Sequence, residues 1–276
     1  MTKKAAKLFL CGVGAAPDDE INLAAAALSL ASLDRPRVSL DYYENHLSEL
    51  SEAIQTRSRG AGKSAQECAS ILQTVIASEY GYQGDQVTYD DLQNANLMWV
   101  IDRRRGLPVA LGILYIHVGR TMGWALKGMA FPGHFLVQLD AFGERIIIDP
   151  FNNGCQRTAE ELRQLLKSTA GAERELRPED YATVSDRDVL LRLQNNLKFR
   201  FMQMRDAAAA LQTIDTMLLF APDHKALWWE SGVLNREQGN LQAAARALEE
   251  YMSREDNEGN KHRAAAMVQK IRRELN

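Results

Sequence analysis

Residues 102–154 decide the fold, and they read DRRRGLPVALGILYIHVGRTMGWALKGMAFPGHFLVQLDAFGERIIIDPFNNG. Gly106-Leu107-Pro108 opens a run in which nearly every side chain is apolar. Proline suits the first position of a helix, because its fixed φ is helical and its missing N–H would have no partner there. Apolar residues on most faces indicate a helix that is buried in a core. We therefore expect a core helix over residues 106–122.

Two short apolar segments follow this helix, and a turn separates them. Residues 134–139 and 145–149 flank Phe142-Gly143, a pair that suits a hairpin turn. If these two residues form the loop, Ala141 pairs with Glu144. The sequence therefore predicts an antiparallel hairpin with a fixed register.

The hairpin carries the candidate catalytic residues, His134 and Asp149. In this register Leu136 faces Asp149, so His134 lies diagonal to Asp149 on the same face, where long side chains can meet. A histidine held by an aspartate near a helix N-terminus is the arrangement of a Cys-His-Asp site. The alternative is structural: His134 caps the hairpin, and Asp149 begins the turn at Pro150.

The nucleophile that such a site needs is missing. A thiol would sit in the first turn of the 106–122 helix, where the positive end of the helix dipole lowers its pKa. Residues 108–111 are Pro-Val-Ala-Leu, and none of them is nucleophilic. Cys155 is the one thiol close to His134 in the sequence, but it follows the hairpin in a Gly-rich turn with no helix N-terminus to acidify it.

The order of these motifs resembles the transglutaminase-like superfamily, whose pattern runs from Gly-x-Cys through a helix to a strand His and a strand Asp. Gly106, His134 and Asp149 match it, and Pro108 stands where the pattern has its Cys. RRRGLP, FPGHFLV and IDPFNNG resemble more closely the SirB-type branch, which joins such a core to tetratricopeptide repeats. The resemblance covers about residues 18–276. It implies a mainly helical α+β fold: a papain-like core with a small antiparallel sheet, then an all-α repeat region.

The periodicity of the sequence changes after residue 184. A 34-residue unit that starts at Leu191 and a second that starts at Lys225 share the anchor positions of tetratricopeptide repeats. In the second unit these anchors are Trp228, Gly232, Gly239, Ala244 and Leu248. In the first unit they are Leu197, Phe201, Ala210, Ile214 and Pro222. A helix over residues 261–275 would close the array.

These patterns divide the chain into three parts. We expect an extension over residues 1–17, a transglutaminase-like core with helices at its start over 18–175, and repeat helices over 184–276. Two repeats and a closing helix are fewer than the three usually needed to stand alone. We therefore expect the repeats to pack on the core.

The N-terminal residues have a weak signal-peptide character. Lys3, Lys4 and Lys7 precede an apolar run over residues 8–16, but the run is short and glycines interrupt it. Leu10 before Cys11 does not suit a lipoprotein cleavage site. The chain has three scattered cysteines and no CxxC, which is typical of a reducing compartment and argues against a disulfide framework. We expect a cytoplasmic protein.

Composition narrows the kinds of partner. The chain has 276 residues, 46% hydrophobic and 25% charged, with a net charge of −3. A nearly neutral chain gives no general reason to expect nucleic acid or a membrane as partner. Residues 57–64 end in Gly-Lys-Ser, but Arg57 stands where a phosphate-binding loop has its first Gly, with four residues between it and Gly62. We read them as a linker between two helices.

Other residues beside the hairpin could contact a ligand. Arg104 and Arg105 belong to a basic run that abuts the candidate site, where one could meet a carboxylate. Gly133 and Asn152 flank the two candidate catalytic residues. His134 and Asp149 could also be two metal ligands, but no third is evident. We expect no metal and no cofactor.

Two functions remain open. In the first, the chain is a non-catalytic relative of thiol acyl-transfer enzymes and binds a protein or peptide partner, with the repeats supplying a surface. In the second, it hydrolyses or transfers acyl groups, with His134 and Asp149 activating water or a non-standard nucleophile. Losing the nucleophile of a triad removes on the order of a millionfold in rate, so we favour the first.

Overall fold

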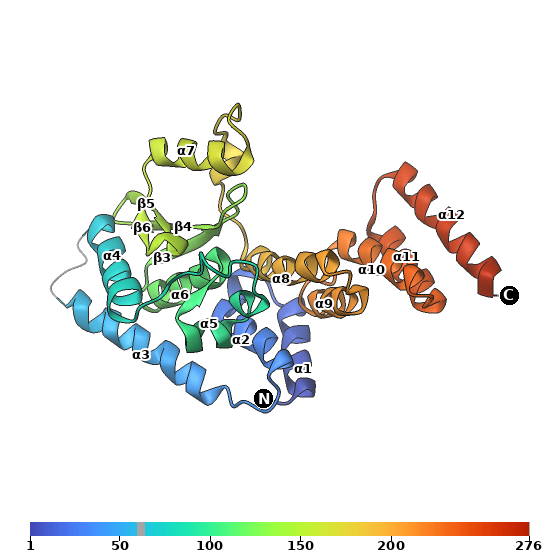
Figure 1. The fold of residues 1–276 in the computed structure, drawn as a ribbon, viewed down its shortest axis with the longest axis horizontal. Coiled ribbons are helices and arrows are strands. Elements are labelled where there is room, and N and C mark those ends of the chain that lie inside the picture. The colour runs from blue at the N-terminus through green and yellow to red at the C-terminus, as the bar shows by residue number, and fades with distance from the viewer. Residues whose placement is uncertain (60–63, 276) are drawn as a thin grey trace. The chain divides into compact units, whose positions relative to one another are not determined.

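The computed structural model describes residues 1–59 and 64–275 (Figure 1). The chain divides into two compact units: residues 1–6 with 17–193, and residues 7–16 with 194–276. Half of the linker expected at 57–64 falls on residues 60–63, which lie outside the described residues, and Arg57 and Ser58 belong to the end of a helix. No helix among the residues described is long and apolar enough to cross a membrane.

The first unit is mainly helical. Its α-helices are α2 (Leu23–Asp34), α3 (Asp41–Ser58), α4 (Ala65–Leu72), α5 (Leu97–Arg103), α6 (Pro108–Thr121) and α7 (Ala159–Ala170). Shorter helical segments are η1 (Asp18–Glu20), η2 (Gln73–Glu79), η3 (Leu92–Ala95), η4 (Pro150–Asn152) and η5 (Pro178–Tyr181). The segment η2 is a π-helix that continues α4. The helical stretch over residues 65–79 therefore changes its hydrogen-bond pattern halfway along.

Helix α6 is the centre of this unit. It begins with Pro108 at its first position, and almost all of its side chains are buried. It packs against α2, α3 and the strands β3 (Ala125–Met129) and β4 (Leu136–Ala141). The core helix predicted from the apolar run is therefore confirmed.

A four-stranded antiparallel sheet follows α6, in the order β3-β4-β5-β6. Strand β5 is Glu144–Asp149 and strand β6 is Cys155–Gln156. Ala141 pairs with Glu144, and Val137 with Ile148, as the predicted hairpin register requires. Both loop residues, Phe142 and Gly143, have positive φ values of 54° and 79°, which is the backbone of a type I′ turn.

The two strands that flank this hairpin, β3 and β6, are not predicted from the sequence. Strand β3 occupies residues read only as a link, because Gly128 puts no side chain at an inward position and Met129 is buried directly after it. The two-residue strand β6 is too short to leave a pattern. A separate parallel pair, β1 (Gln83–Gly84) with β2 (Arg105–Gly106), joins segments far apart in the sequence.

The second unit consists of helices. It contains most of α1 (Lys3–Ala15), the second half of α8 (Asp186–Gln203), α9 (Ala207–Phe220), α10 (Lys225–Glu237), α11 (Leu241–Arg254) and α12 (Glu258–Leu275). Gly232 allows α10 to approach α11 closely, because a Cβ there would lie 2.7 Å from Leu248 Cγ. Between residue 184 and residue 275, all described, there is no strand. The mainly helical α+β fold with an all-helical C-terminal region is confirmed.

Candidate functional site

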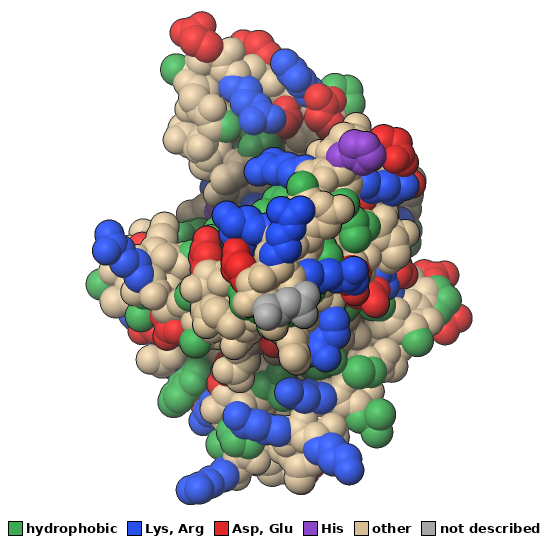
Figure 2. Space-filling view, turned by 90° about the vertical axis from the view of Figure 1, so that its right-hand side faces the viewer, with side chains coloured by type: hydrophobic (Ala, Val, Ile, Leu, Met, Phe, Trp, Pro, Cys, Tyr) green, Lys and Arg blue, Asp and Glu red, His purple; other side chains and the backbone are tan. Residues whose placement is uncertain are grey.

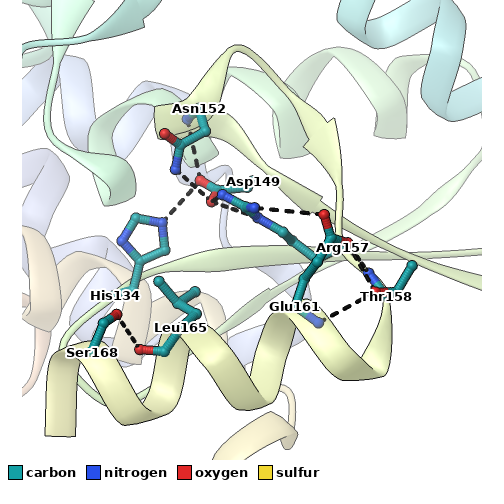
Figure 3. Close-up of polar contacts among 8 residues, drawn as sticks. All are labelled: His134, Asp149, Asn152, Arg157, Thr158, Glu161, Leu165 and Ser168. Carbon is teal, nitrogen blue, oxygen red and sulfur yellow. Dashed lines mark hydrogen bonds and ion pairs between the residues drawn. The ribbon is translucent and has the colours of Figure 1, made fainter.

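His134 and Asp149 are in contact, as the hairpin register predicts. His134 lies just before β4 and Asp149 ends β5, and His134 Nε2 is 2.9 Å from Asp149 Oδ1 (Figure 3). The Asp149 side chain is fully buried, and His134 is 9% exposed. A neutral imidazole that donates from Nε2 keeps Nδ1 as its acceptor. The pair is therefore an oriented imidazole on a buried carboxylate.

Asp149 accepts further hydrogen bonds from two other residues. Asn152 donates from its backbone N (3.3 Å) and from Nδ2 (2.8 Å). Arg157 donates from Nε (3.1 Å) and Nη2 (2.8 Å), both to Oδ2. Burial alone would raise the pKa of Asp149, but the hydrogen bonds from His134, Asn152 and Arg157 outweigh it and lower the pKa to about 2. The carboxylate therefore stays ionised above that pH, held by hydrogen bonds from His134, Asn152 and Arg157.

The surroundings of His134 are closely packed. The ring of Phe151 meets the imidazole edge-on, with 6.0 Å between centroids. Arg192 Nη2 donates to the backbone O of His134 at 2.6 Å. On the other side, Thr169 of α7 donates from Oγ1 to the backbone O of Pro132 at 2.8 Å. His134 is thus held by its side chain, by its carbonyl and by the turn that precedes it.

The other predicted binding residues differ in position. Asn152 joins the site directly, and Gly133 lies in the preceding turn with φ +71°, where a Cβ would lie 2.7 Å from Thr169 Cβ. Arg104 instead contacts His46 and Tyr82, and its guanidinium lies 4.7 Å from the Tyr82 ring centroid.

Arg104 therefore belongs to a separate cluster of side chains. The side chain of Arg105 is exposed, and its backbone pairs with Gln83. Over the described part of the chain, no hydrogen bond or ion pair joins Arg104 or Arg105 to the His134–Asp149 pair.

No thiol takes the place of the nucleophile. Pro108 is buried at the first position of α6. Cys155 sits opposite Asp149 across the β5–β6 pair and is half-buried. Burial raises its pKa, and the negative charge of Asp149 adds to this, whereas Arg157 acts against it. The site therefore holds an imidazole and a carboxylate, and the thiol beside them has a raised pKa.

Two residues of the site were missed in the sequence. Arg157 follows a two-residue strand, and nothing in the sequence marks it as the partner of Asp149; it also approaches Glu161 of α7 at 3.9 Å. Tyr115 lies two turns after Pro108 on α6, and its hydroxyl is buried without a hydrogen-bond partner among the described residues. That hydroxyl lies against Gly154, where a Cβ would approach it to 2.3 Å.

Burial and the nearby Cys155 and Asp149 raise the pKa of Tyr115. The Tyr115 hydroxyl is therefore a neutral group beside the site.

Among the described residues, no cluster of three His, Cys, Asp or Glu side chains could hold a metal ion. The donors of the site are thus an imidazole, an amide and a guanidinium that all converge on one carboxylate.

Comparison with known proteins gives the relatives of this chain. It is 28% identical to a UPF0162 protein of Xylella fastidiosa over 85% of this chain and 84% of that one. It is 26% identical to protein SirB1 of Salmonella typhimurium, over 55% of this chain and 58% of that protein. Human F-box only protein 21 is 30% identical over 132 residues, which cover 45% of this chain and 20% of that protein.

Family models match both regions. The model described as tetratricopeptide repeat matches residues 197–272. The model described as transglutaminase-like superfamily matches residues 41–195, which is more than half of the chain and includes α6, the sheet and the His134–Asp149 pair. The chain therefore belongs to the transglutaminase-like superfamily, with a tetratricopeptide-repeat region after its core and homologues in the UPF0162/SirB1 family.

Proposed function

We propose that this chain is a non-catalytic transglutaminase-like protein that acts as a binding or regulatory module for a protein or peptide partner. The observation that carries the proposal is Pro108, buried at the first position of α6, where a thiol nucleophile would be acidified by the helix. Removing the nucleophile of a triad costs on the order of a millionfold in rate. An imidazole and a carboxylate alone supply little of that.

The hydrogen bonds of Asp149 give the pair a structural role instead. They connect the residue before β4, the η4 turn and the residue after β6 through one buried carboxylate. Such a network stabilises the end of the sheet whether or not a reaction takes place there. This accounts for a His–Asp pair in a site that has no nucleophile.

The repeat region supports a binding role. Stacked helical repeats present extended surfaces that bind protein partners. In this chain they follow a core whose candidate site is nearly closed to solvent, since His134 is 9% exposed and Asp149 is fully buried. A partner would therefore bind through the repeat surface.

The direct test is an activity panel. The wild type, His134→Ala and Cys155→Ala are incubated with an amine donor and a glutamine peptide, and separately with peptide and ester substrates. We expect the three proteins to give the same background rate. A robust rate that Cys155→Ala abolishes would overturn the proposal and identify Cys155 as the nucleophile.

The converse test restores the missing thiol. In Pro108→Cys the new thiol would stand at the helix N-terminus, and we expect it to react unusually fast with iodoacetamide near neutral pH. The matched control is Cys155 in the wild type, whose pKa is raised. An ordinary thiol pKa at position 108, in a variant that still folds, would mean that the likeness to a catalytic cleft is only topological.

A second candidate function is supported by the orientation of His134. Its Nε2 contacts Asp149, so Nδ1 is the atom that could accept a proton from water. In that case the chain would be a hydrolase that activates water without a thiol. A hydrolytic rate that His134→Ala and Asp149→Asn both abolish, and that Cys155→Ala leaves unchanged, would support it.

A further inference from the structure

A small cavity in the repeat unit has a lining that no function has yet explained. It has a volume of about 250 Å³ and lies among residues of α10, α11, α12 and the turn between α11 and α12. This is below the roughly 300–1,000 Å³ of pockets that hold drug-sized ligands, so it suits one residue-sized group. Its lining combines aromatic rings with charged and amide side chains: Lys225, Trp229, Tyr251, Glu255, Asn260 and Arg263.

The one carboxylate in the cavity is fully used by the protein. Glu255 is 6% exposed, and its Oε2 accepts from Tyr251 Oη (2.6 Å) and Asn260 Nδ2 (3.3 Å). Its Oε1 accepts from Lys225 Nζ (2.9 Å) and from the backbone N of Asp256 (2.9 Å) and Asn257 (3.1 Å). Hydrogen bonds from Tyr251 and Lys225 hold the pKa of Glu255 well below its usual range. Glu255 therefore has little left to offer a cationic ligand.

The two cationic side chains of the cavity, Arg263 and Lys225, still have N–H donors without an acceptor in the described part of the chain. Arg263 is exposed, and its guanidinium lies 5.2 Å from the Trp229 ring centroid. Among the described residues it has no carboxylate within ion-pair distance. Lys225 has three N–H donors; Glu255 takes one, and Asp256 Oδ2 lies 4.0 Å from its Nζ. The cavity thus offers a ligand N–H donors, chiefly those of Arg263.

The rest of the wall is aromatic. The rings of Trp229 and Tyr251 lie 5.3 Å apart at 58°, and Tyr251 is 8% exposed. Such rings bind a planar or apolar body by contact area at little cost in side-chain entropy. Figure 2 shows many Lys and Arg side chains, with Asp and Glu among them, on the face turned toward the viewer, and α12 carries five Lys or Arg against two Glu. This field favours the approach of an anion.

We infer that this cavity binds a carboxylate carried on an aromatic body the size of one residue, with Arg263 pairing with the carboxylate and Trp229 and Tyr251 contacting the ring. The group is either the C-terminal residue of a partner peptide or a small free aromatic acid. The inference rests on the proposed binding function and specifies one subsite of the repeat surface.

The test uses the full-length protein and N-acetylphenylalanine, followed by saturation-transfer NMR. We expect a Kd on the order of 1 mM for such a small ligand. We expect at least about tenfold weaker binding of the amide of the same compound, and of the acid to Arg263→Gln, because a charge-assisted hydrogen bond is lost. Arg263 is the residue to change, because replacing Lys225 would also remove a partner of Glu255.

The matched control is Arg246→Gln on α11, an exposed arginine that does not line the cavity. It should bind the acid like the wild type. A second arm uses a hexapeptide that ends in phenylalanine, with a free or an amidated C-terminus. Tighter binding of the free peptide than of N-acetylphenylalanine would identify a chain end as the ligand, and equal binding a free acid.

Three results would overturn the inference: no binding of the acid at 10-fold the expected Kd, equal binding of acid and amide, or undiminished binding to Arg263→Gln in a protein that still folds. None of them bears on catalysis, which the substrate panel measures at His134 and Cys155. A robust catalytic rate would contradict the proposed non-catalytic function, but it would not affect the result on ligand binding in the cavity.

Discussion

Asp149 is the residue on which the candidate site depends. One oxygen accepts from His134 and the other from Arg157 and Asn152, so the carboxylate holds three separate segments together. Removing one partner from a buried ion pair typically costs about 3–5 kcal/mol, because the other charge is left uncompensated. The Arg157 side chain is 20% exposed, so water would recover part of that cost here.

The lowered pKa of Asp149 predicts a pH dependence of folding. The pKa is about 2 in the folded chain against 3.8 for the free group, so Asp149 contributes stability above pH 3.8 that is lost as the pH falls toward 2. The difference corresponds to about 2 kcal/mol. Urea unfolding between pH 5 and pH 2.5 should show a loss about 1–2 kcal/mol larger in the wild type than in Asp149→Asn, because other carboxylates with a lowered pKa, such as Asp85, act in both proteins. Equal losses in both proteins would mean that the network does not hold the carboxylate ionised.

Tyr115 gives a second prediction for a single residue. Its buried hydroxyl has no partner among the described residues, and an unpaired buried polar group costs about 1–3 kcal/mol. Tyr115→Phe should therefore leave the free energy of unfolding unchanged or raise it by about 1 kcal/mol. The control is Tyr82→Phe, which removes a hydroxyl that contacts His46 and Arg104 and should lower it by about 1 kcal/mol. A loss of more than about 1 kcal/mol in Tyr115→Phe would contradict the prediction.

At the level of elements, the sequence predicts those helices and turns that depend only on neighbouring residues. The apolar run after Pro108 and the Phe142-Gly143 turn fix α6 and the β4–β5 hairpin, and with them the contact between His134 and Asp149. Strand β3 could not be recognised, since Gly128 leaves one inward position without a side chain and Met129 is buried directly after it, so that only pairing with β4 makes it a strand. Arg157 could not be recognised either, because its role depends on the position of β6.

The close approach of α6 to the sheet can be tested at Gly112. A Cβ there would lie 2.5 Å from Cε1 of Phe135, whose side chain is 1% exposed and cannot move away. Gly112→Ala should lower the free energy of unfolding by about 1–3 kcal/mol, although alanine is the better helix former. Gly12→Ala in α1 is the control: nothing lies within 4 Å of its new Cβ, so it should stabilise by about 0.5–1 kcal/mol. Thermal unfolding of both variants gives the comparison, and a stabilised Gly112→Ala would refute the close packing.

At the level of the whole molecule, the first residues of the chain form a helix that groups with the repeat helices, which their sequence does not indicate. Residues 1–17 were predicted as an extension with weak signal-peptide character, yet Lys3–Ala15 form α1, and residues 7–16 group with the repeat helices. Gly14 lies against α9, where a Cβ would come within 2.3 Å of the backbone O of Leu219. The buried positions of this segment, Ala6, Leu10 and Val13, have the spacing of a helix, but the lysines and glycines between them hide it in the sequence.

Two leucines of α1 test whether this helix belongs to the folded protein. Leu10 is fully buried, whereas Leu8 is 73% exposed. Leu10→Ala should lower the free energy of unfolding by about 2–5 kcal/mol, because it leaves a cavity, and Leu8→Ala should change it by less than about 0.5 kcal/mol. Urea unfolding of the full-length variants measures both, and hydrogen exchange should show lost protection in α1 and α9 for Leu10→Ala alone. If the two variants were equally stable, the segment would be an extension after all, and the repeat helices would have to be stable without it.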